Sequence, residues 1–527
     1  MRRFSSYGPV NDKLHYYVPR NELIEKGYSQ LVGEPPEEGG HYFTVWAPRQ
    51  TGKSTLMKDI LLRLKKDSRF DTLVINLENF KYETNSIRMM NQIAIKIGEG
   101  LGKPVFEITS TDQFQEIFRK NILDKPLILI LDEFDALDES IINALVSSLR
   151  SIYNIRQYES EKSANQKTYL LHSIALIGVR RVLGIENEKG SPFNVQRSLH
   201  ISNLTFEEVK EMFAWYERES GQKIDEIVPR ILYEETLGQP GLTCWFGELL
   251  TETYNTDPSK PITIEHFKEA YGAANYVLPN NNILNIISKV NKPPFNEMVM
   301  NLFETGEKMT FSFDDPEINN LYMNGVIVPD KAGYDEYYVK FSCPFVQNRI
   351  FSYFSRRFFN HLGQLLSPLD SMKDAITEDV LFIPNIIKRY REYLRKNRDM
   401  FFKEVPRRKT DLKIYEAVYH LNLYRYLFDL LKKRGVDVIP QFPTGNGKID
   451  LILKYREKKY AIELKSFKDM YTFEKGIEQA AEYGKQLGLN EISYLVFVEL
   501  SDEDIRQFEK HIERDGITVV ILPISIL

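Results

Sequence analysis

Two acidic residues and a lysine near the end of the chain have the types and spacing of a phosphodiester-cleaving site. Asp450 lies shortly before the segment Glu463–Lys465, and apolar residues surround both. Two neighbouring carboxylates repel each other unless a cation lies between them, so Mg²⁺ or Mn²⁺ is the expected ligand of Asp450 and Glu463. A bound metal lowers the pKa of its water and stabilises the charge on the phosphate. The sequence therefore predicts metal-dependent cleavage, with Lys465 positioning the water or the phosphate.

Two strands and a helix must position these side chains. Ile449–Leu453 and Tyr460–Lys465 are apolar runs separated by the polar turn Lys454–Lys459, which predicts adjacent hairpin strands. Such strands bring Asp450 and Glu463 side by side. Lys465 projects from the same face as Glu463, because side chains alternate along a strand. The preceding segment, from 410 to 434, is expected to be a helix that carries Glu416.

A second chemical site lies near the start of the chain. Ala47–Ser54 is a loop that ends in Gly-Lys-Ser between an apolar strand and a helix, the arrangement that surrounds phosphates with backbone N–H groups. Lys53 would contact the β- and γ-phosphates, and Ser54 would hold Mg²⁺. Ala47 replaces the first glycine of the pattern. The predicted ATP-binding residues of the loop are Arg49, Gln50, Thr51, Gly52, Lys53, Ser54 and Thr55.

Acidic residues complete the predicted nucleotide site. The apolar strand Leu127–Leu131 ends in Asp132 and Glu133, an arrangement that orients Mg²⁺ and polarises a water. Asp132 is the predicted metal-side carboxylate and Glu133 the catalytic base. The acids that follow, Asp135, Asp138 and Glu139, are expected on a solvated helix face.

An arginine follows another apolar strand, Ile174–Gly178. Arg180 could sense the γ-phosphate, because a guanidinium pairs with phosphate oxygens in a fork geometry, and Arg181 could substitute for it. Arginines also end many strands, so both readings stay open.

The pattern around these residues predicts an α/β multidomain protein. Short buried parallel strands, which carry continuous apolar runs, alternate with amphipathic stretches up to about residue 200. The chain then turns helical, opening with Thr205 as a helix cap that pairs with Glu208. Residues 288 to 352 are expected to form a small helical unit with a β-wing. Such a unit serves DNA binding or packing equally well, and its acidic residues are Glu304, Glu307, Asp314, Asp315 and Glu317.

A basic run between residues 388 and 409 has two readings. It carries nine basic side chains interleaved with aromatic ones. They could bind phosphates while the aromatic rings stack on bases, or form a solvated helix face above buried rings. The basic residues are Lys388, Arg389, Arg391, Arg395, Lys396, Arg398, Arg407, Arg408 and Lys409, and the rings are Tyr390, Tyr393, Phe401 and Phe402.

The first 350 residues resemble the STAND and origin-recognition-like branch of AAA+ P-loop ATPases. Arg49–Thr55, the Asp132–Glu133 pair, Ser191–Asn194 and Gly238–Pro240 carry the resemblance, together with the upstream segment His15–Arg20. It covers roughly residues 10 to 350 and implies an ASCE-type P-loop ATPase core with a parallel sheet, a helical lid and a winged helix. It also implies a slow nucleotide switch in which Pro240 lies near the bound base of ATP.

The C-terminal segment, about 411 to 527, resembles the PD-(D/E)xK nuclease superfamily. Asp450, Glu463 and Lys465 fill its core motif, although Ile449 stands where the name-giving proline would be. The resemblance implies a restriction-endonuclease-like α/β domain in which Glu416 completes the metal site and Gln479 and Tyr483 form the downstream motif. Some members of such folds keep the scaffold without the activity.

Bulk properties set limits on these expectations. A chain of 527 residues is too long to fold around one hydrophobic core, so about three domains are expected. The net charge of −5 requires any DNA contact to come from a local patch. Two cysteines indicate a reducing compartment, and the absence of a signal-like or membrane-spanning apolar run predicts a soluble cytoplasmic protein. The expected domains are an ATPase core (1–200), a helical lid (201–287), a winged-helix-like unit (288–355), a linker with a basic helical segment (356–410) and a nuclease-like domain (411–527).

Together these features predict an ATP-binding and ATP-hydrolysing switch that controls a metal-dependent nuclease. The expected partner is nucleic acid, DNA in preference to RNA, in defence or genome maintenance, and no membrane is involved. ATP and Mg²⁺ are the expected cofactors, with Mn²⁺ as a second candidate at the nuclease site. The alternative is a STAND-like signalling ATPase whose C-terminal domain binds nucleic acid or a partner without cleaving it. A homo-oligomer is left open, as is endonuclease versus exonuclease action.

Overall fold

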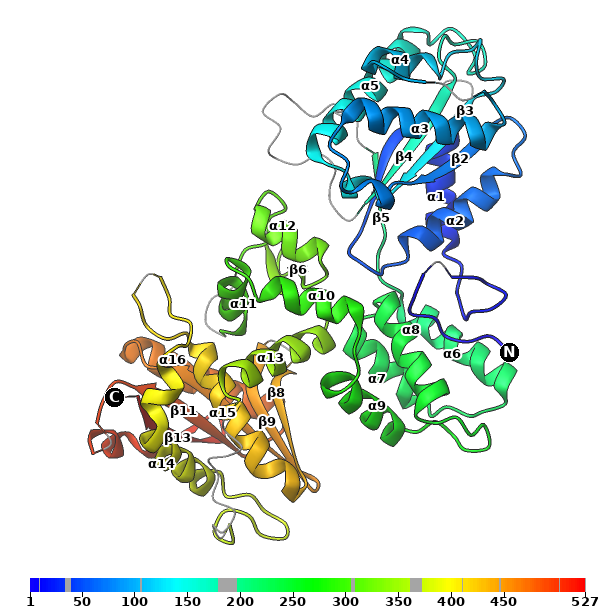
Figure 1. The fold of residues 1–527 in the computed structure, drawn as a ribbon. Helices are drawn as coiled ribbons and strands as arrows, with labels where there is room; N and C mark the ends of the chain where they lie inside the picture. Colours follow the sequence, from blue (N-terminus) through cyan, green and yellow to red (C-terminus); the bar gives the residue numbers. More distant parts are fainter. Residues whose placement is uncertain are drawn as a thin grey trace. The chain divides into compact units, whose positions relative to one another are not determined.

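The protein divides into two compact units (Figure 1). The computed structural model describes residues 1–8, 10–33, 39–104, 107–178, 197–304, 309–360, 372–409, 411–444, 447–501 and 503–526. Unit 1 comprises Met1–Ile286, Ser312–Val328 and Ser342–Pro344, and unit 2 comprises Ile287–Phe311, Pro329–Phe341 and Phe345–Leu527. Within the described residues, no helix is long and apolar enough to cross a bilayer.

A five-stranded parallel sheet forms the centre of unit 1. The strand order is β2-β3-β4-β1-β5, with every pairing parallel. The apolar runs of β1, β3 and β4 form buried strands, as predicted. The run of β2 forms an edge strand in which Ile75 alone is buried and Val74 is 40% exposed, so the prediction of a buried strand is wrong there. The strands are β1 (Tyr42–Trp46), β2 (Asp71–Asn76), β3 (Leu127–Asp132), β4 (Leu171–Gly178) and β5 (Arg197–His200).

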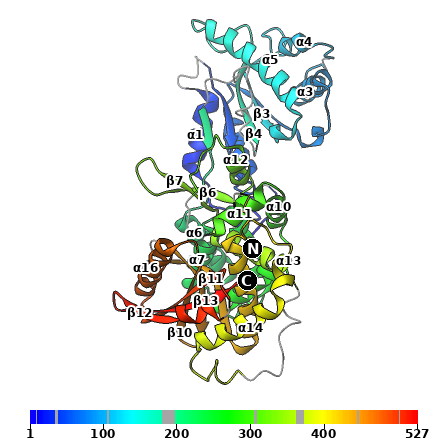
Figure 2. The ribbon, with the colours of Figure 1, turned by 90° about the vertical axis from the view of Figure 1, so that its left-hand side faces the viewer.

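Helices cover both faces of this sheet (Figure 2). Alternate residues of β3 divide between two cores: Leu127, Leu129 and Leu131 belong to the core under α3, α4 and α5, and Ile128 and Ile130 to the core under α1 and α2. Burial on both faces explains why the strand sequence is apolar throughout. The helices are α1 (Asn21–Val32), α2 (Lys53–Leu64), α3 (Ser86–Leu101), α4 (Thr111–Glu116) and α5 (Glu139–Tyr158), with short turns η1 (Glu78–Phe80) and η2 (Phe134–Ala136).

The rest of unit 1 is mainly helical. The predicted cap is present: the Glu208 backbone N–H donates to Thr205 Oγ1 at 3.2 Å, and the Thr205 N–H donates to the Glu208 carboxylate at 2.8 Å. A further helix contacts the parallel sheet, since the Tyr322 ring lies 6.0 Å from that of Trp46. The helices are α6 (Phe206–Ser220), α7 (Ile227–Thr236), α8 (Pro240–Glu248), η3 (Leu249–Thr253), α9 (Ile264–Tyr276) and α12 (Pro316–Met323); α10 (Asn281–Val290) spans the unit boundary.

Unit 2 is built on a six-stranded mixed sheet. Its order is β12-β13-β11-β10-β9-β8. The three central strands β10, β11 and β13 run parallel, whereas β8, β9 and β10 are antiparallel neighbours. The strands are β8 (Val436–Thr444), β9 (Gly447–Tyr455), β10 (Lys458–Ser466), β11 (Glu491–Val498), β12 (Lys510–Arg514) and β13 (Ile517–Ser525); a separate pair is β6 (Ile327–Lys331) and β7 (Tyr337–Phe341).

Helices pack on opposite sides of this sheet, with α16 on one and α14 on the other (Figure 2). Gly476 of α16 allows close approach to the sheet, because a Cβ there would lie 2.1 Å from the Tyr494 hydroxyl. On the other face, Tyr419 of α15 stacks on Phe497 of β11, with ring centroids 4.5 Å apart. The helices are α11 (Phe295–Phe303), α13 (Pro344–Phe358), α14 (Ile383–Phe402), α15 (Glu416–Leu431) and α16 (Met470–Gln486), with η5 (Lys432–Arg434) and η6 (Asp504–Phe508).

The basic run of residues 388–409 falls largely on α14, and its aromatic side chains are buried. Tyr390 is fully buried, and Tyr393, Phe401 and Phe402 are at most 7% exposed. Tyr390 also donates a hydrogen bond of 2.8 Å to Asn422 Oδ1 of α15. Stacking of bases on Tyr390, Tyr393 and Phe401 is therefore wrong as a prediction, because these rings already hold α14 against the core.

Candidate functional site

A tight loop joins β1 to α2 and carries the Gly-Lys-Ser sequence. Gly52 has φ +88°, a left-handed conformation that favours glycine, and Gln50 adopts φ +58°. Thr51 Oγ1 donates to the Pro48 carbonyl at 2.8 Å. The loop thus ends at the N-terminus of a 12-residue helix, where free N–H groups and the helix dipole favour phosphate.

Lys53 is folded into this loop. Its Nζ donates to the carbonyl oxygens of Ala47 and Pro48 at 2.8 and 2.9 Å. Burial lowers the pKa of Lys53 to about 8, although the charges of Glu133 and Asp135 act in the opposite direction. A buried ammonium bonded only to carbonyls is well prepared to exchange these contacts for the stronger ones to phosphate.

The two acids at the end of β3 lie near this lysine. Burial raises the pKa of both Asp132 and Glu133, and Lys53 lowers both in part. Glu133 adopts φ +55°, an uncommon conformation for a residue with a side chain, and such conformations cluster at functional sites. The structure therefore brings the predicted lysine, metal-side acid and base together.

Asp135 departs from the expectation of a solvated helix face. It is half-buried, and a Cβ on Gly178 would lie 2.6 Å from its Oδ1. The short 3₁₀ turn η2 after β3 directs it back toward the sheet. By contrast, Asp138 and Glu139 are exposed as expected, and Asp138 caps α5 by accepting from the Ser140 N–H at 2.9 Å.

The Gly238–Pro240 turn lies directly against the phosphate-binding loop. Gln239 Nε2 donates to the carbonyls of Arg49 and Gln50, both at 3.2 Å, and the Gly241 N–H donates to the Gln50 carbonyl at 3.1 Å. A Cβ on Gly241 would lie 2.4 Å from Gln50 Oε1. The helical region after residue 203 is therefore tied to the loop by backbone contacts. The predicted residues Arg180, Arg181 and Ser191–Asn194 lie outside the described residues.

The second set of predicted residues lies on the β9–β10 hairpin of unit 2. Leu451 pairs with Ile462, so Asp450 and Glu463 occupy the next position along the same ladder, as predicted. The Leu464 N–H donates to Asp450 Oδ2 at 2.8 Å. Asp450 is 3% exposed and Glu463 is fully buried. The residues before and after each acid are apolar: Ile449 and Leu451 flank Asp450, and Ile462 and Leu464 flank Glu463. The two carboxylates therefore lie in an otherwise apolar part of the sheet.

Lys465 and Glu416 adjoin this pair. Lys465 Nζ lies 3.1 Å from Glu463 Oε1 and 3.6 Å from Glu416 Oε1. Glu416, the first residue of α15, also accepts from the Ser466 N–H at 2.7 Å. Burial alone would lower the pKa of Lys465, but the neighbouring carboxylates raise it. The lysine therefore stays an ammonium.

The two buried carboxylates need positive charge. Burial raises the pKa of Asp450 to about 6. It raises the pKa of Glu463 well above the usual range, and the Asp450 charge adds to that effect. Both Glu463 oxygens are buried and form no hydrogen bond; their contact is the ion pair with Lys465. Oxygen donors of this kind suit Mg²⁺ and Mn²⁺.

Glu416, Asp450 and Glu463 do not converge as a ready-made cation site. Across the residues that the structure describes, no three His, Cys, Asp or Glu side chains are grouped so that they could hold a metal ion. The physical reason is the ammonium of Lys465, which lies against both Glu416 and Glu463. Asp450 and Glu463 fit a metal, and Glu416 would join them only if Lys465 moved.

A cavity of about 450 Å³ opens beside this cluster. Glu416, Lys465, Gln479 and Tyr483 are among its lining residues, and Gln479 Nε2 donates to the Tyr483 hydroxyl at 2.5 Å. Burial raises the pKa of Tyr483, and the Glu463 charge raises it further. The helix α16 thus places the predicted downstream pair at the mouth of the carboxylate site.

Two acid–base residues of this site escaped the sequence analysis. His420, one helical turn after Glu416, has Nδ1 3.8 Å from Asp450 Oδ1, and burial lowers its pKa to about 3, so it is neutral. Glu304 Oε1 accepts from the Glu416 N–H at 2.9 Å, and burial raises its pKa to about 6. The four-residue spacing of Glu416 and His420 on one helix face was a usable signal. Nothing local marked Glu304.

Comparison with known proteins supports the ATPase part. Residues 5–243 match the family model of the AAA-like domain, and no curated protein matches the chain. A Walker-type ATPase of Pyrococcus abyssi is similar at 15% identity and a TM-score of 0.45, covering 66% of this chain and 99% of that one. The ORC1 protein of Aeropyrum pernix, solved in complex with DNA, shows 16% identity and a TM-score of 0.35, with 65% and 94% covered.

Cdc6p of Pyrobaculum aerophilum is similar at 15% identity with a TM-score of 0.36, covering 65% of this chain and 97% of that one. The family match spans the β1–α2 loop, the acids after β3 and the Gly238–Pro240 turn. The matched residues 5–243 all lie in unit 1, so unit 1 contains the part of the chain that is similar to the AAA-like domain.

Proposed function

We propose that ATP bound to unit 1 controls a Mg²⁺- or Mn²⁺-dependent nuclease in unit 2 that acts on DNA. The observation that carries the nuclease part is the buried pair Asp450 and Glu463 with Lys465 beside it. Lys465 lines a cavity that Gln479 and Tyr483 also line. Burying two carboxylates is costly, above all for Glu463, whose oxygens form no hydrogen bond. A bound cation and a phosphate substrate would account for both acids on these adjacent strands.

In the ATPase site, the loop and three side chains have distinct tasks. Lys53 would exchange its carbonyl contacts for contacts to the β- and γ-phosphates. Ser54 and Asp132 would hold Mg²⁺, and Glu133 would accept a proton from the attacking water. Gln239 links the phosphate-binding loop to the helical region through hydrogen bonds. A nucleotide that shifts the loop would therefore also shift the helical region. Control of unit 2 by this site is part of the proposal.

In the nuclease site, the reaction is hydrolysis of a phosphodiester. A divalent cation held by Asp450 and Glu463 would lower the pKa of a water and neutralise charge on the phosphate. The ammonium of Lys465, which lies at the cavity wall, binds a non-bridging phosphate oxygen. Water oxygen bonds to phosphorus, the bond from phosphorus to one ester oxygen breaks, and that oxygen leaves with a proton.

The test is cleavage of linear and circular DNA with Mg²⁺ or Mn²⁺, in the presence and absence of ATP. We expect cleavage by the wild-type chain, its loss in Asp450→Ala, and a changed ATP response in Lys53→Ala. An Asp450→Ala variant that cleaves as fast as the wild type would refute the site. RNA in the same assay decides between the two nucleic acids.

A second candidate function is a signalling switch that binds nucleic acid or a partner without cutting it. The favouring observation is that Lys465 already contacts both Glu463 and Glu416, so part of their negative charge is compensated without a metal. ATP-dependent assembly with no cleavage of DNA or RNA under any metal would select this function.

A further inference from the structure

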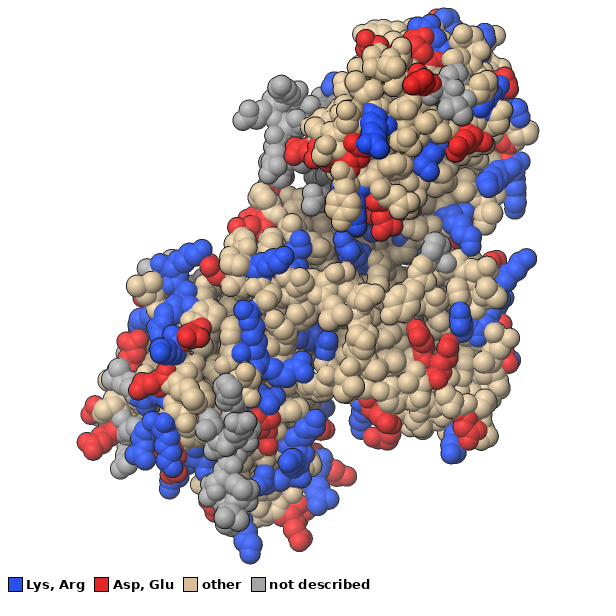
Figure 3. Space-filling view, in the orientation of Figure 1, with Lys and Arg blue, Asp and Glu red and all other residues tan. Residues whose placement is uncertain are grey.

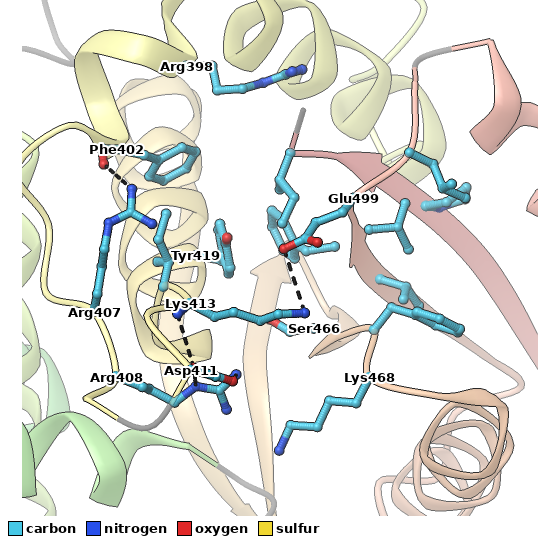
Figure 4. A pocket seen from close by; sticks show the side chains of 18 of the residues that line it. Arg398, Phe402, Arg407, Arg408, Asp411, Lys413, Tyr419, Ser466, Lys468 and Glu499 are labelled. Atoms are coloured by element: carbon cyan, nitrogen blue, oxygen red, sulfur yellow. Dashed lines mark hydrogen bonds and ion pairs between the residues drawn. The ribbon is translucent and has the colours of Figure 1, made fainter.

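A larger cavity lies at one edge of the unit 2 sheet (Figure 4). Its volume is about 1300 Å³, and its walls include Ser466, Val498 and Ile526. Ser466 and Val498 are the last residues of β10 and β11, and Ile526 follows β13. These strands are parallel, so the cavity lies outside their carboxyl ends, the edge at which open α/β sheets bind ligands.

The cavity wall carries an excess of positive charge. Arginine and lysine contribute six lining side chains, whereas aspartate and glutamate contribute three. Two of the acids are paired with bases inside the wall, in Arg408–Asp411 at 2.8 Å and Lys413–Glu499 at 3.7 Å. No ion pair recorded for the described residues involves the other four bases, Arg398, Lys403, Arg407 and Lys468. Figure 3 shows Lys and Arg side chains gathered over the elements of unit 2.

Exposed apolar side chains surround these charges. Leu412, Phe467, Met470 and Leu500 line the cavity and are all among the exposed large hydrophobic residues. In Figure 4, Arg398, Arg407, Lys413 and Lys468 extend around the same space. Proteins that bind single-stranded nucleic acid use cationic groups to follow the phosphate backbone and apolar side chains to contact the unpaired bases. The wall of this cavity offers both.

The cavity shares part of its wall with the smaller cavity beside the carboxylates. Seven residues line both this cavity and the smaller one that holds Glu416 and Lys465. Ser466 is among them, and its N–H is bonded to Glu416 at 2.7 Å. A strand bound in the larger cavity would therefore reach the carboxylate site along a shared wall.

We propose that this cavity binds an unpaired segment of nucleic acid and leads it to Asp450 and Glu463, an inference that rests on the proposed nuclease function. Small-molecule pockets usually measure about 300 to 1,000 Å³, and this cavity exceeds that range. A duplex exposes only its backbone and base edges to a protein and would leave the apolar wall without stacked partners. An acidic peptide would satisfy the charges but not the flat apolar surface.

The test measures binding of a fluorescently labelled single-stranded oligonucleotide by anisotropy, with EDTA present so that nothing is cleaved. The test variant Lys403→Gln/Lys468→Gln removes two exposed cavity charges. The control Lys388→Gln/Lys396→Gln removes two exposed charges from α14 that do not line the cavity. All four side chains are exposed, so both variants are expected to fold.

We expect the test pair to weaken binding about tenfold and to reduce the slope of log affinity against log salt by about 1.4, the value for two lost phosphate contacts on a single strand. The control pair should leave both quantities unchanged. Equal effects of the two pairs, equal affinity for duplex, or displacement by poly-glutamate as effective as by unlabelled oligonucleotide would overturn the proposal.

This outcome is separable from that of the proposed function. Wild-type cleavage that is unaffected by Lys403→Gln/Lys468→Gln would refute the cavity as the substrate path and leave the nuclease standing. Binding that depends on this lysine pair, without cleavage under any metal, would refute the nuclease and leave the cavity as a nucleic-acid site.

Discussion

Each unit places one lysine beside two acids, yet the two lysines are held in opposite ways. Lys53 is bonded to backbone carbonyls, and burial lowers its pKa to about 8. Lys465 is paired with carboxylates, which raise its pKa in spite of burial. The acids of unit 1 are half-buried, whereas Asp450 and Glu463 are at most 3% exposed.

The difference shows which charge each site lacks. A buried ammonium that faces carbonyl dipoles gains most from an added anion, which in unit 1 we propose to be a nucleotide phosphate. A buried pair of carboxylates that shares one ammonium gains most from an added cation. On our proposal the same residue types make an anion site in unit 1 and a cation site in unit 2, because the groups that contact each lysine differ.

The largest expected effect is on the stability of unit 2. Lys465→Met leaves Asp450 and Glu463 buried without a counter-charge, so we expect the free energy of unfolding at pH 8 to fall by about 3 to 5 kcal/mol. Chemical denaturation of the full chain measures this, and Mn²⁺ should restore part of the loss. Lys459→Met, which removes an exposed lysine from the same strand, serves as the control.

Combining Lys465→Met with Glu463→Gln should recover most of that stability, because removing both partners of a buried pair is far less costly than removing one. A Lys465→Met variant as stable as the wild type would show that the ion pair is not what neutralises the carboxylates.

The next effect is on nucleotide binding by unit 1. Lys53→Ala removes the charged donor that is to meet the β- and γ-phosphates, and we expect ATP affinity to fall about a hundredfold, measured by calorimetry. Lys66→Ala, an exposed lysine just after α2, should bind ATP normally. If Lys53→Ala and the wild type bind ATP with equal affinity, Lys53 does not bind the phosphates, and the contrast drawn between Lys53 and Lys465 is wrong.

The pH dependence of ATP binding sharpens the comparison. The pKa of Lys53 is about 8 without nucleotide, and bound phosphates raise it, so binding takes up a proton when the pH exceeds that value. Affinity should be full below pH 8 and fall by up to about tenfold per pH unit above it. Lys53→Arg, which stays charged, should flatten the profile. A flat wild-type profile between pH 7 and 9.5 would contradict this account of Lys53.

The smallest expected effect concerns the link between the loop and the helical region. Gln239→Ala removes two hydrogen bonds to loop carbonyls, and we expect ATP affinity to fall about threefold. Gln157→Ala, at an exposed position of α5, should show no change in the same titration. A Gln239→Ala variant with wild-type ATP affinity would show that the hydrogen bonds between Gln239 and the loop do not contribute to nucleotide binding.

Features written into short stretches of sequence could be predicted. The apolar runs of β1, β3 and β4, the Thr205–Glu208 cap and the pairing of Asp450 with Glu463 each depend on neighbouring residues or on one hairpin turn, so periodicity and turn chemistry were sufficient. The residues of the β1–α2 loop were equally readable, because the loop is a continuous motif.

Features that depend on distant packing could not. Glu304 reaches Glu416 from a position more than a hundred residues away, and the turn η2 directs Asp135 toward Gly178. The sequence could not decide whether the aromatic residues of the basic run stack on bases or are buried, because it does not show that the Tyr390 hydroxyl bonds to Asn422 of another helix. The position of Lys465 between Glu416 and Glu463 likewise required the fold.

The most direct test of the cation site in unit 2 is a calorimetric titration of Mn²⁺ into the full chain without nucleotide. Wild type, Glu463→Gln and Asp132→Asn are compared. We expect one Mn²⁺ site in the wild type that persists in Asp132→Asn and is lost in Glu463→Gln. Mn²⁺ binding that survives Glu463→Gln unchanged, or its absence from the wild type, would contradict the account.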